Sequence, residues 1–200
     1  MTTTRGLRAD AARNYERIVT AAAHAFEDTG PEVTLEEVAR RAGVGIATVY
    51  RRFGNREELV RAVLEQLLEQ EIAPVVQVRT DDPWQDLTGA LRAAVDVLAG
   101  RRVLLRLAKE TGAFRSESLK PYGESLHRLL SRAIEAGLVR PELEVRDLAA
   151  VIVMALAPLR PHDTDTADRR RYLALLVDGL RPGGAPLPAG AEHPVLLDEG

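Results

Sequence analysis

The chain has 200 residues and a net charge of −3; this length suits one domain or two small ones, and this charge argues against a protein that coats nucleic acid. It has no cysteine, which excludes a disulfide scaffold, a thiolate zinc site and a thiol nucleophile and fits a reducing cytoplasm. The longest apolar run, from Ala149 to Ala157, falls far short of the roughly 20 residues of a membrane span, and the N-terminus shows no apolar signal-peptide segment. We therefore expect a cytoplasmic protein that does not enter membranes.

Helical periodicity runs through nearly the whole sequence, and no stretch alternates as a strand does. A first helix is predicted over residues 10–29. Thr34 then opens a second, short helix with a capping box, in which its hydroxyl accepts the Glu37 N–H and the Glu37 carboxylate returns to the Thr34 N–H. Gly43 ends this helix, because the turn that follows requires a residue tolerant of a left-handed backbone.

A third, equally short helix is predicted from about Ile46 to Arg52. Asn55 resembles the start of another capping box and opens a longer helix to about Ile72. Pro74 has no N–H and crowds the preceding turn, so this helix should end or kink there. Five more helices follow, at residues 83–99, 102–109, 118–136, 145–159 and 166–180. About nine helices and no strand predict an all-α fold.

Residues 34–56 have the form of a helix-turn-helix, with two short helices joined by a tight turn that contains glycine. In the second helix Val49 and Phe53 can face a core, and the other side chains cannot all be buried. These side chains suit a DNA major groove, because arginine bonds guanine or phosphate, small apolar groups meet thymine methyls and a tyrosine hydroxyl donates to phosphate. They are Ile46, Ala47, Thr48, Tyr50, Arg51 and Arg52.

The charge is uneven along the chain. Through Arg56, nine arginines stand against seven acidic residues, which gives this part a charge of +2, while the rest of the chain carries −5. A reader of one DNA sequence needs only a local basic face, and acidity elsewhere limits non-specific coating of DNA. The net charge of −3 therefore does not exclude a specific DNA site.

The stretch from Phe26 to Leu59 resembles the DNA-binding domain of the TetR/AcrR family of bacterial transcriptional regulators, above all in the run TLEEVARRAGVGIATVYRRFGNREEL. The resemblance covers roughly residues 13–63 and implies an all-α homodimer in which three N-terminal helices bind DNA. A variable C-terminal helical domain would contain an inducer pocket and the dimer interface. We accordingly expect three regions: an arm and helix-turn-helix domain over 1–55, a ligand-binding and dimerisation domain over 56–181, and a disordered tail over 182–200.

The resemblance also implies roles for single residues. Thr34 would cap its helix against a DNA phosphate, and Thr48 and Tyr50 would contact phosphate or bases. Arg56 stands where the family most often has lysine, and its two-pronged guanidinium would reach the DNA backbone. Gly45 replaces the serine or alanine frequent at the start of the recognition helix and brings no hydroxyl to the phosphate. The positions that vary within the family, and so are candidates for choosing the operator sequence, are Ile46, Ala47, Arg51 and Arg52.

The N-terminal arm carries four arginines, at positions 5, 8, 13 and 17. Two interpretations stay open. In the first, at least one of these arginines reaches a minor groove or a flanking phosphate of DNA. In the second, the terminus is frayed and solvated and makes no contact with DNA.

The last two predicted helices are candidates for a dimer interface. The run from Ala149 to Ala157 is apolar around its whole circumference, so one side can pack in the chain's own core and the other against a partner subunit. The final helix has a narrow apolar seam of the kind found in helical bundles. The predicted interface residues are Val151, Met154, Ala155, Tyr172, Leu173, Leu176, Val177 and Leu180.

Members of the family bind small molecules between central helices, which correspond here to residues 59–72, 84–99, 102–109 and 118–136. The same side chains would also make an ordinary core. Aromatic residues make up only 4% of the chain, which favours an aliphatic or mixed ligand over a large flat one. The candidate ligand-binding residues are Trp84, Leu87, Leu91, Leu105, Phe114, Tyr122, Leu126 and His127, the last being favoured as a partly exposed histidine without a ligand.

No motif points to catalysis, a cofactor or a metal. The four histidines lack a metal-ligand spacing, and neither a Ser/His/Asp arrangement nor a Gly-rich phosphate loop occurs. The leading hypothesis is a homodimeric repressor that leaves a palindromic DNA operator when a small-molecule effector binds. The alternatives are the same fold with a protein effector or no inducer, and a ligand-binding protein that has lost DNA binding; a small helical enzyme is disfavoured.

Overall fold

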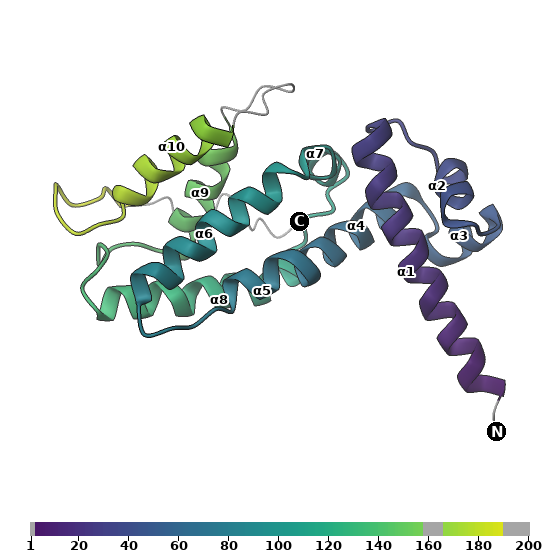
Figure 1. Ribbon diagram of the computed structural model, residues 1–200, viewed down its shortest axis with the longest axis horizontal. Coiled ribbons are helices and arrows are strands. Elements are labelled where there is room, and N and C mark those ends of the chain that lie inside the picture. The colour runs from purple at the N-terminus through teal and green to yellow at the C-terminus, as the bar shows by residue number, and fades with distance from the viewer. Residues whose placement is uncertain (1–2, 158–165, 190–200) are drawn as a thin grey trace. The chain divides into compact units, whose positions relative to one another are not determined.

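The computed structural model describes residues 3–157 and 166–189, with side chains from residue 10 onward except that of Thr166. Within these ranges every regular element is a helix, which confirms the all-α fold (Figure 1). The helices are α1 Thr3–Thr29, α2 Leu35–Ala42, α3 Ile46–Phe53, α4 Arg56–Leu67, a π-helical turn Leu68–Ile72, α5 Ala73–Val76, α6 Pro83–Ala99, α7 Arg102–Glu110, α8 Ser116–Glu135, α9 Val145–Leu156 and α10 Thr166–Asp178. In this described part of the chain, no helix combines the length and the apolar content that a membrane crossing requires.

The helices group into two compact units. The first unit contains α1 to α4 together with α7, and the second contains α5, α6 and α8 to α10. The predicted boundary between residues 55 and 56 does not coincide with this division, because α4 and α7 pack with the N-terminal helices. The assignment of DNA binding to one region and ligand binding to another stays a prediction.

The first unit is built around the C-terminal half of α1. Ile18, Val19 and Phe26 on α1 are almost completely buried, and α1 packs against α2, α4 and α7. Residues 10–13 are exposed, and Figure 1 shows that this end of α1 extends beyond α2 and α3. The helix begins at Thr3 rather than near residue 10 as predicted, because apolar periodicity marks only the packed part of a helix.

The long helix predicted from Asn55 to Ile72 continues past its predicted end. Asn55 caps α4 through its side-chain oxygen, which accepts the Glu58 N–H at 2.8 Å. Pro74 lies in α5, and its ring and missing N–H would disturb an ordinary α-helical turn before it. The turn before it, Leu68–Ile72, is π-helical, which means that its hydrogen bonds span one residue more than those of an α-helix. The irregularity predicted at Pro74 is therefore a π-helical turn.

The second unit is arranged around α6, which packs against α5, α8, α9 and α10. Leu87, Leu91 and Val95 on α6 are completely buried, and Asp82 caps the helix by accepting the Gln85 N–H at 3.0 Å. One carboxylate, that of Asp86, is also buried in this helix.

Asp86 joins α6 to α8 and to the loop before α6. Its carboxylate accepts the N–H and the hydroxyl of Thr80, at 2.9 and 2.7 Å, and a guanidinium N–H of Arg132 at 2.6 Å. Arg132 also donates to the Thr80 carbonyl at 2.6 Å. Burial opposes ionisation of Asp86, yet these donors outweigh it and hold the pKa of Asp86 below its usual value.

The segment after α10 lies near the loop between α8 and α9. The Arg140 N–H donates to the Leu180 carbonyl at 2.9 Å, and the Arg140 guanidinium donates to the Ala185 carbonyl at 2.9 Å. Residues 182–189 are otherwise exposed. The sequence predicted disorder over residues 182–200, of which residues 190–200 lie outside the described part of the chain.

Candidate nucleic-acid interface

The helix-turn-helix is formed by α2, α3 and the turn between them. Gly43 ends α2 with φ 63°, the left-handed conformation that the sequence predicted. The guanidinium of Arg17 on α1 donates to the Ala42 carbonyl at 2.6 Å and would lie 2.9 Å from a Cβ at position 43. The turn is therefore fixed both by a glycine and by an arginine from α1, and Arg17 acts here within the protein.

The α3 helix buries Val49 and Phe53, as predicted, and its opposite face is exposed. Ala47, Tyr50 and Arg51 lie on this exposed face, and the Tyr50 ring is 48% exposed. The remaining predicted contacts on α3 differ in exposure: Arg52 is exposed, and Ile46 and Thr48 are half-buried. Gly45 precedes α3 in an extended conformation and offers no side-chain cap.

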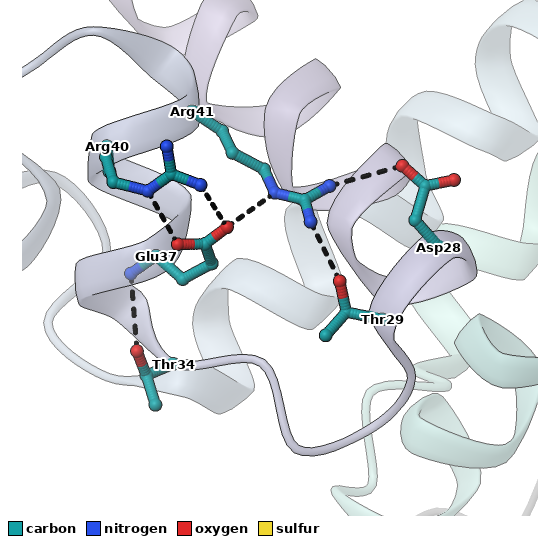
Figure 2. A network of polar contacts seen from close by, with 6 residues as sticks. All are labelled: Asp28, Thr29, Thr34, Glu37, Arg40 and Arg41. Carbon is teal, nitrogen blue, oxygen red and sulfur yellow. Dashed lines mark hydrogen bonds and ion pairs between the residues drawn. The ribbon is translucent and has the colours of Figure 1, made fainter.

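Thr34 caps α2 as predicted, because its hydroxyl accepts the Glu37 N–H at 3.2 Å. The second half of the predicted capping box is wrong. The Glu37 carboxylate accepts from the guanidinium groups of Arg40 and Arg41 instead of returning to the Thr34 N–H (Figure 2). Two charged donors offer this carboxylate stronger hydrogen bonds than one neutral N–H.

The Glu37 network also joins α2 to the end of α1. Figure 2 shows Arg41 between the Glu37 carboxylate, at 2.8 Å, and the Asp28 carboxylate and Thr29 hydroxyl, at 3.2 and 2.8 Å. The hydrogen bonds from Arg40 and Arg41 lower the pKa of Glu37 to about 2. The charges of both arginines are thus balanced within the protein.

The arginines of α1 to α4 with described side chains therefore fall into two groups. Those with a carboxylate or carbonyl partner are Arg13 with Asp10, Arg17 with Ala42, Arg40 and Arg41 with Glu37, and Arg61 with Glu58. Those that form no ion pair among the described residues are Arg51, Arg52 and Arg56. The positive charge that stays uncompensated in these helices lies on α3 and at the start of α4.

Arg56, unlike Arg51 and Arg52, has part of its guanidinium buried. Its guanidinium carbon lies 6.0 Å from the centre of the Phe26 ring, and its Nε and Nη2 atoms are buried without a hydrogen-bond partner. The two-pronged phosphate contact predicted for Arg56 therefore requires the side chain to turn away from Phe26. Orphan N–H groups favour such a movement when an anion is available.

The predicted dimer residues divide between a buried and an exposed set. Val151, Ala155, Leu173, Val177 and Leu180 are at most 5% exposed in the single chain and belong to the core of the second unit, so their contact with a partner subunit stays a prediction. The large apolar side chains exposed on α9 and α10 are Val153, Met154, Tyr172 and Leu175, with Leu176 half-buried beside them. Val153 and Leu175 are not among the predicted interface residues; in the apolar run that contains Val153, the sequence does not reveal which side its own chain covers.

The predicted ligand-binding residues divide between the two units. Leu105 and Phe114 belong to the first unit, and the other six belong to the second. Leu87, Leu91 and Leu126 are buried, whereas Phe114 and His127 are exposed and do not line a core. The described residues contain no cluster of three or more side chains that could hold a metal ion.

Two pockets lie elsewhere. One, of about 230 Å³, is in the first unit between α1, α3 and α4, and the other, of about 170 Å³, is in the second unit between α6 and α10. None of the eight predicted ligand-binding residues lines either pocket. No sequence motif marks these two pockets, since each combines arginines with residues from helices distant in the sequence.

Comparison with known proteins agrees with this architecture. The family model of bacterial regulatory proteins of the TetR family matches residues 18–63, and a model of the C-terminal domain of SbtR-like transcriptional regulators matches residues 82–182. The A-factor receptor protein of Streptomyces griseus is 28% identical over 84% of this chain and 62% of its own length. The regulator NfxB of Pseudomonas aeruginosa is 33% identical over 54% of this chain and 56% of its own length. The chain thus spans less than two thirds of these curated relatives.

A solved structure covers more of the chain. The TetR transcription regulatory protein from Mycobacterium vanbaalenii is 30% identical, with a TM-score of 0.62 over 88% of this chain and 99% of that one. The two matched models together include α2, α3, most of α4 and all of α6 to α10. The helix-turn-helix, the helical second unit and these matches lead to one conclusion: the chain belongs to the TetR family of bacterial transcriptional regulators.

Proposed function

We propose that this protein is a transcriptional repressor that binds a palindromic DNA operator as a homodimer and leaves it when a small-molecule effector binds. The observation that carries DNA binding is the distribution of charge on the helix-turn-helix. Arg40 and Arg41 on α2 are balanced by carboxylates, whereas Arg51 and Arg52 on α3 have no carboxylate partner among the described residues. An exposed guanidinium without an internal partner is free to bond guanine or phosphate.

Within α3, the exposed residues support different roles. Ala47 and Arg51 lie at the centre of the exposed face, where a recognition helix meets base edges. Tyr50 lies beside them with a hydroxyl that can donate to phosphate. We assign base reading to Ala47 and Arg51, and backbone contacts to Thr34, Thr48, Tyr50 and Arg56.

Homodimerisation is supported by the exposed apolar face of α9 and α10. Val153, Met154, Tyr172 and Leu175 are between 41% and 64% exposed, and a second copy of the chain would cover them. A two-fold dimer presents two recognition helices about 34–36 Å apart, one turn of B-DNA or its geometric equivalent, which explains the palindrome.

An effector is supported by family membership and by one relative that is named as a receptor. The low aromatic content of 4% favours an aliphatic or mixed ligand for this chain. The effector would act by favouring a dimer whose recognition helices no longer match adjacent major grooves.

The proposal is tested by selecting duplexes from a random-sequence DNA library with the full chain and measuring binding of the enriched duplex at several salt concentrations. We expect a palindromic consensus, and Arg51→Ala should relax base preference within each half-site at a loss of about 1–3 kcal/mol in binding. Arg40→Ala is the matched control, because Arg40 is an exposed arginine already paired with Glu37. Failure to enrich any sequence would remove the proposed DNA binding, and an Arg51 variant with unchanged preference would remove Arg51 from base reading.

A further inference from the structure

Tyr15 on α1 contacts two side chains at the end of the recognition helix, the Phe53 ring and the Arg52 guanidinium. Its ring lies 5.4 Å from the ring of Phe53, at an interplanar angle of 25°. The guanidinium carbon of Arg52 lies 4.8 Å from the centre of the Tyr15 ring. Phe53 is buried, so these contacts tie an exposed arginine to the core of the unit through one tyrosine.

The contact with Tyr15 fixes the direction of Arg52. At about 100° per residue along a helix, Arg52 projects roughly 100° away from Arg51, and the structure places it toward α1. Arg51 lies on the exposed face of α3, whereas Arg52 lies at the edge of that face, near the C-terminal end of the helix. Because Arg52 is turned toward α1 and away from the middle of the exposed face, its position suits the sugar-phosphate backbone better than a base.

Arg52 remains available to an anion. It borders the pocket of about 230 Å³ between α1, α3 and α4, and the α4 wall of this pocket includes Glu58 and Arg61. Glu58 pairs with Arg61 at 2.5 Å, and Arg52 forms no ion pair among the described residues. The aromatic ring thus contacts the guanidinium of Arg52, and no carboxylate among the described residues occupies its N–H donors, which can bond a phosphate.

We propose that Tyr15 is a positioning residue for DNA binding: it holds Arg52 in place to contact a DNA phosphate, and Arg52 does not choose the operator sequence. This inference rests on the proposed DNA-binding function and revises the base-reading role that the sequence suggested for Arg52. An arginine held in one direction loses less conformational freedom when it binds than one that moves freely. Tyr15 therefore strengthens DNA binding without contacting DNA itself.

The test is a double-mutant cycle with the full chain and two duplexes, the one enriched from the random library and a scrambled duplex of equal length. Arg52→Ala should weaken binding to both duplexes by the same factor and lower the salt slope by about one. Tyr15→Leu should weaken both about two- to fivefold, the range of an exposed cation–π contact, with the salt slope unchanged. In the Arg52→Ala background, Tyr15→Leu should have no further effect.

Tyr15→Phe is the matched control, because it keeps the ring and removes only the hydroxyl. It should bind like the wild type, which also shows that a loss in Tyr15→Leu does not come from the hydroxyl. Additive losses in the double variant, an equal loss in Tyr15→Phe, or a changed base preference in Arg52→Ala would each overturn the inference. If the wild type binds neither duplex, the proposed DNA binding fails; if it binds and the cycle is additive, only the role of Tyr15 fails.

Discussion

At the scale of single residues, two glutamates of the first unit have pKa values that move in opposite directions. Glu37 accepts from Arg40 and Arg41, and these hydrogen bonds lower its pKa to about 2. Burial raises the pKa of Glu27 above its usual value, although the hydrogen bond from the Leu104 N–H and the charge of Arg101 both lower it. The residue type is the same, and the balance between burial and nearby donors decides the direction in which the pKa moves.

Glu37→Gln tests the network that joins α2 to α1. A lowered pKa in the folded state means that Glu37 contributes stability fully above its unfolded pKa of 4.5, and that this contribution is lost as pH falls toward 2. We expect the variant to melt at a lower temperature than the wild type at pH 7, with a difference that shrinks between pH 4.5 and pH 2. Thermal unfolding followed by circular dichroism measures this. A difference that stays constant over that range would contradict the ionic role of Glu37.

Glu27 on α1 caps α7, a helix that lies far from it in the sequence. Arg101, at the N-cap position of α7, does not cap this helix with its side chain, and the Glu27 carboxylate accepts the N–H of Leu104 in the first turn. Its Oε1 atom is buried without a partner. The carboxylate therefore caps α7 while part of its charge lacks compensation.

Glu27→Gln should keep the acceptor for the Leu104 N–H and remove the incompletely compensated charge. Because the folded pKa is raised, the stability linked to protonation is fully present below pH 4.5 and is lost as pH rises through the folded pKa. We expect the Gln variant to be at least as stable as the wild type at pH 7 and to show no advantage below pH 4.5. Glu27→Ala is the control and should be less stable by about 1 kcal/mol, the usual effect of a lost cap. Chemical unfolding at both pH values decides between them.

At the scale of elements, the sequence predicted most helix ends correctly because those ends carry local chemistry. The side-chain oxygens of Asn55 and Asp82 cap their helices, and Gly43 takes the left-handed turn. The start of α1 and the π-helical turn before Pro74 were not predicted, since periodicity requires packing and the form of a proline defect depends on the surrounding core. The candidate site follows the same rule: the exposed face of α3 was predictable, and the contacts of Tyr15 were not.

The Asp86 cluster is the element-scale contact that joins α6, α8 and the loop between α5 and α6. The Asp86→Ala substitution removes the acceptor that Arg132 and Thr80 share. The Arg132 side chain is only 21% exposed, so water replaces the lost partner poorly. We expect a loss of about 3 kcal/mol in the free energy of unfolding, as for other broken buried ion pairs. Asp178→Ala is the matched control, because Asp178 pairs with Arg181 on the surface with 80% of its side chain exposed, and its effect should stay within about 1 kcal/mol. Equal losses in urea unfolding of the two variants would rule out a special role for burial at Asp86.

At the scale of the whole molecule, α10 shows why the sequence alone does not separate core residues from candidate interface residues. Leu173, Val177 and Leu180 recur at helical spacing and are buried in the second unit, whereas Tyr172 and Leu175 recur on another side and are exposed. Both sides are apolar in the sequence, and only the fold shows which side its own chain covers. The exposed side, together with Met154 on α9, is therefore the surface that we propose a second copy covers.

Leu175→Glu tests this surface. Leu175 is 64% exposed, so the substitution leaves the core of the single chain intact, and in a dimer it would place an unpaired charge within an apolar interface. We expect the dissociation constant of the dimer to rise at least about tenfold, with a matching loss of binding to a palindromic duplex, because each half-site is then bound separately. Leu187→Glu is the control, since Leu187 is an exposed leucine of the segment after α10 and should leave the dimer unchanged. Sedimentation velocity at several protein concentrations measures the equilibrium, and a Leu175 variant as dimeric as the control would move the interface away from α10.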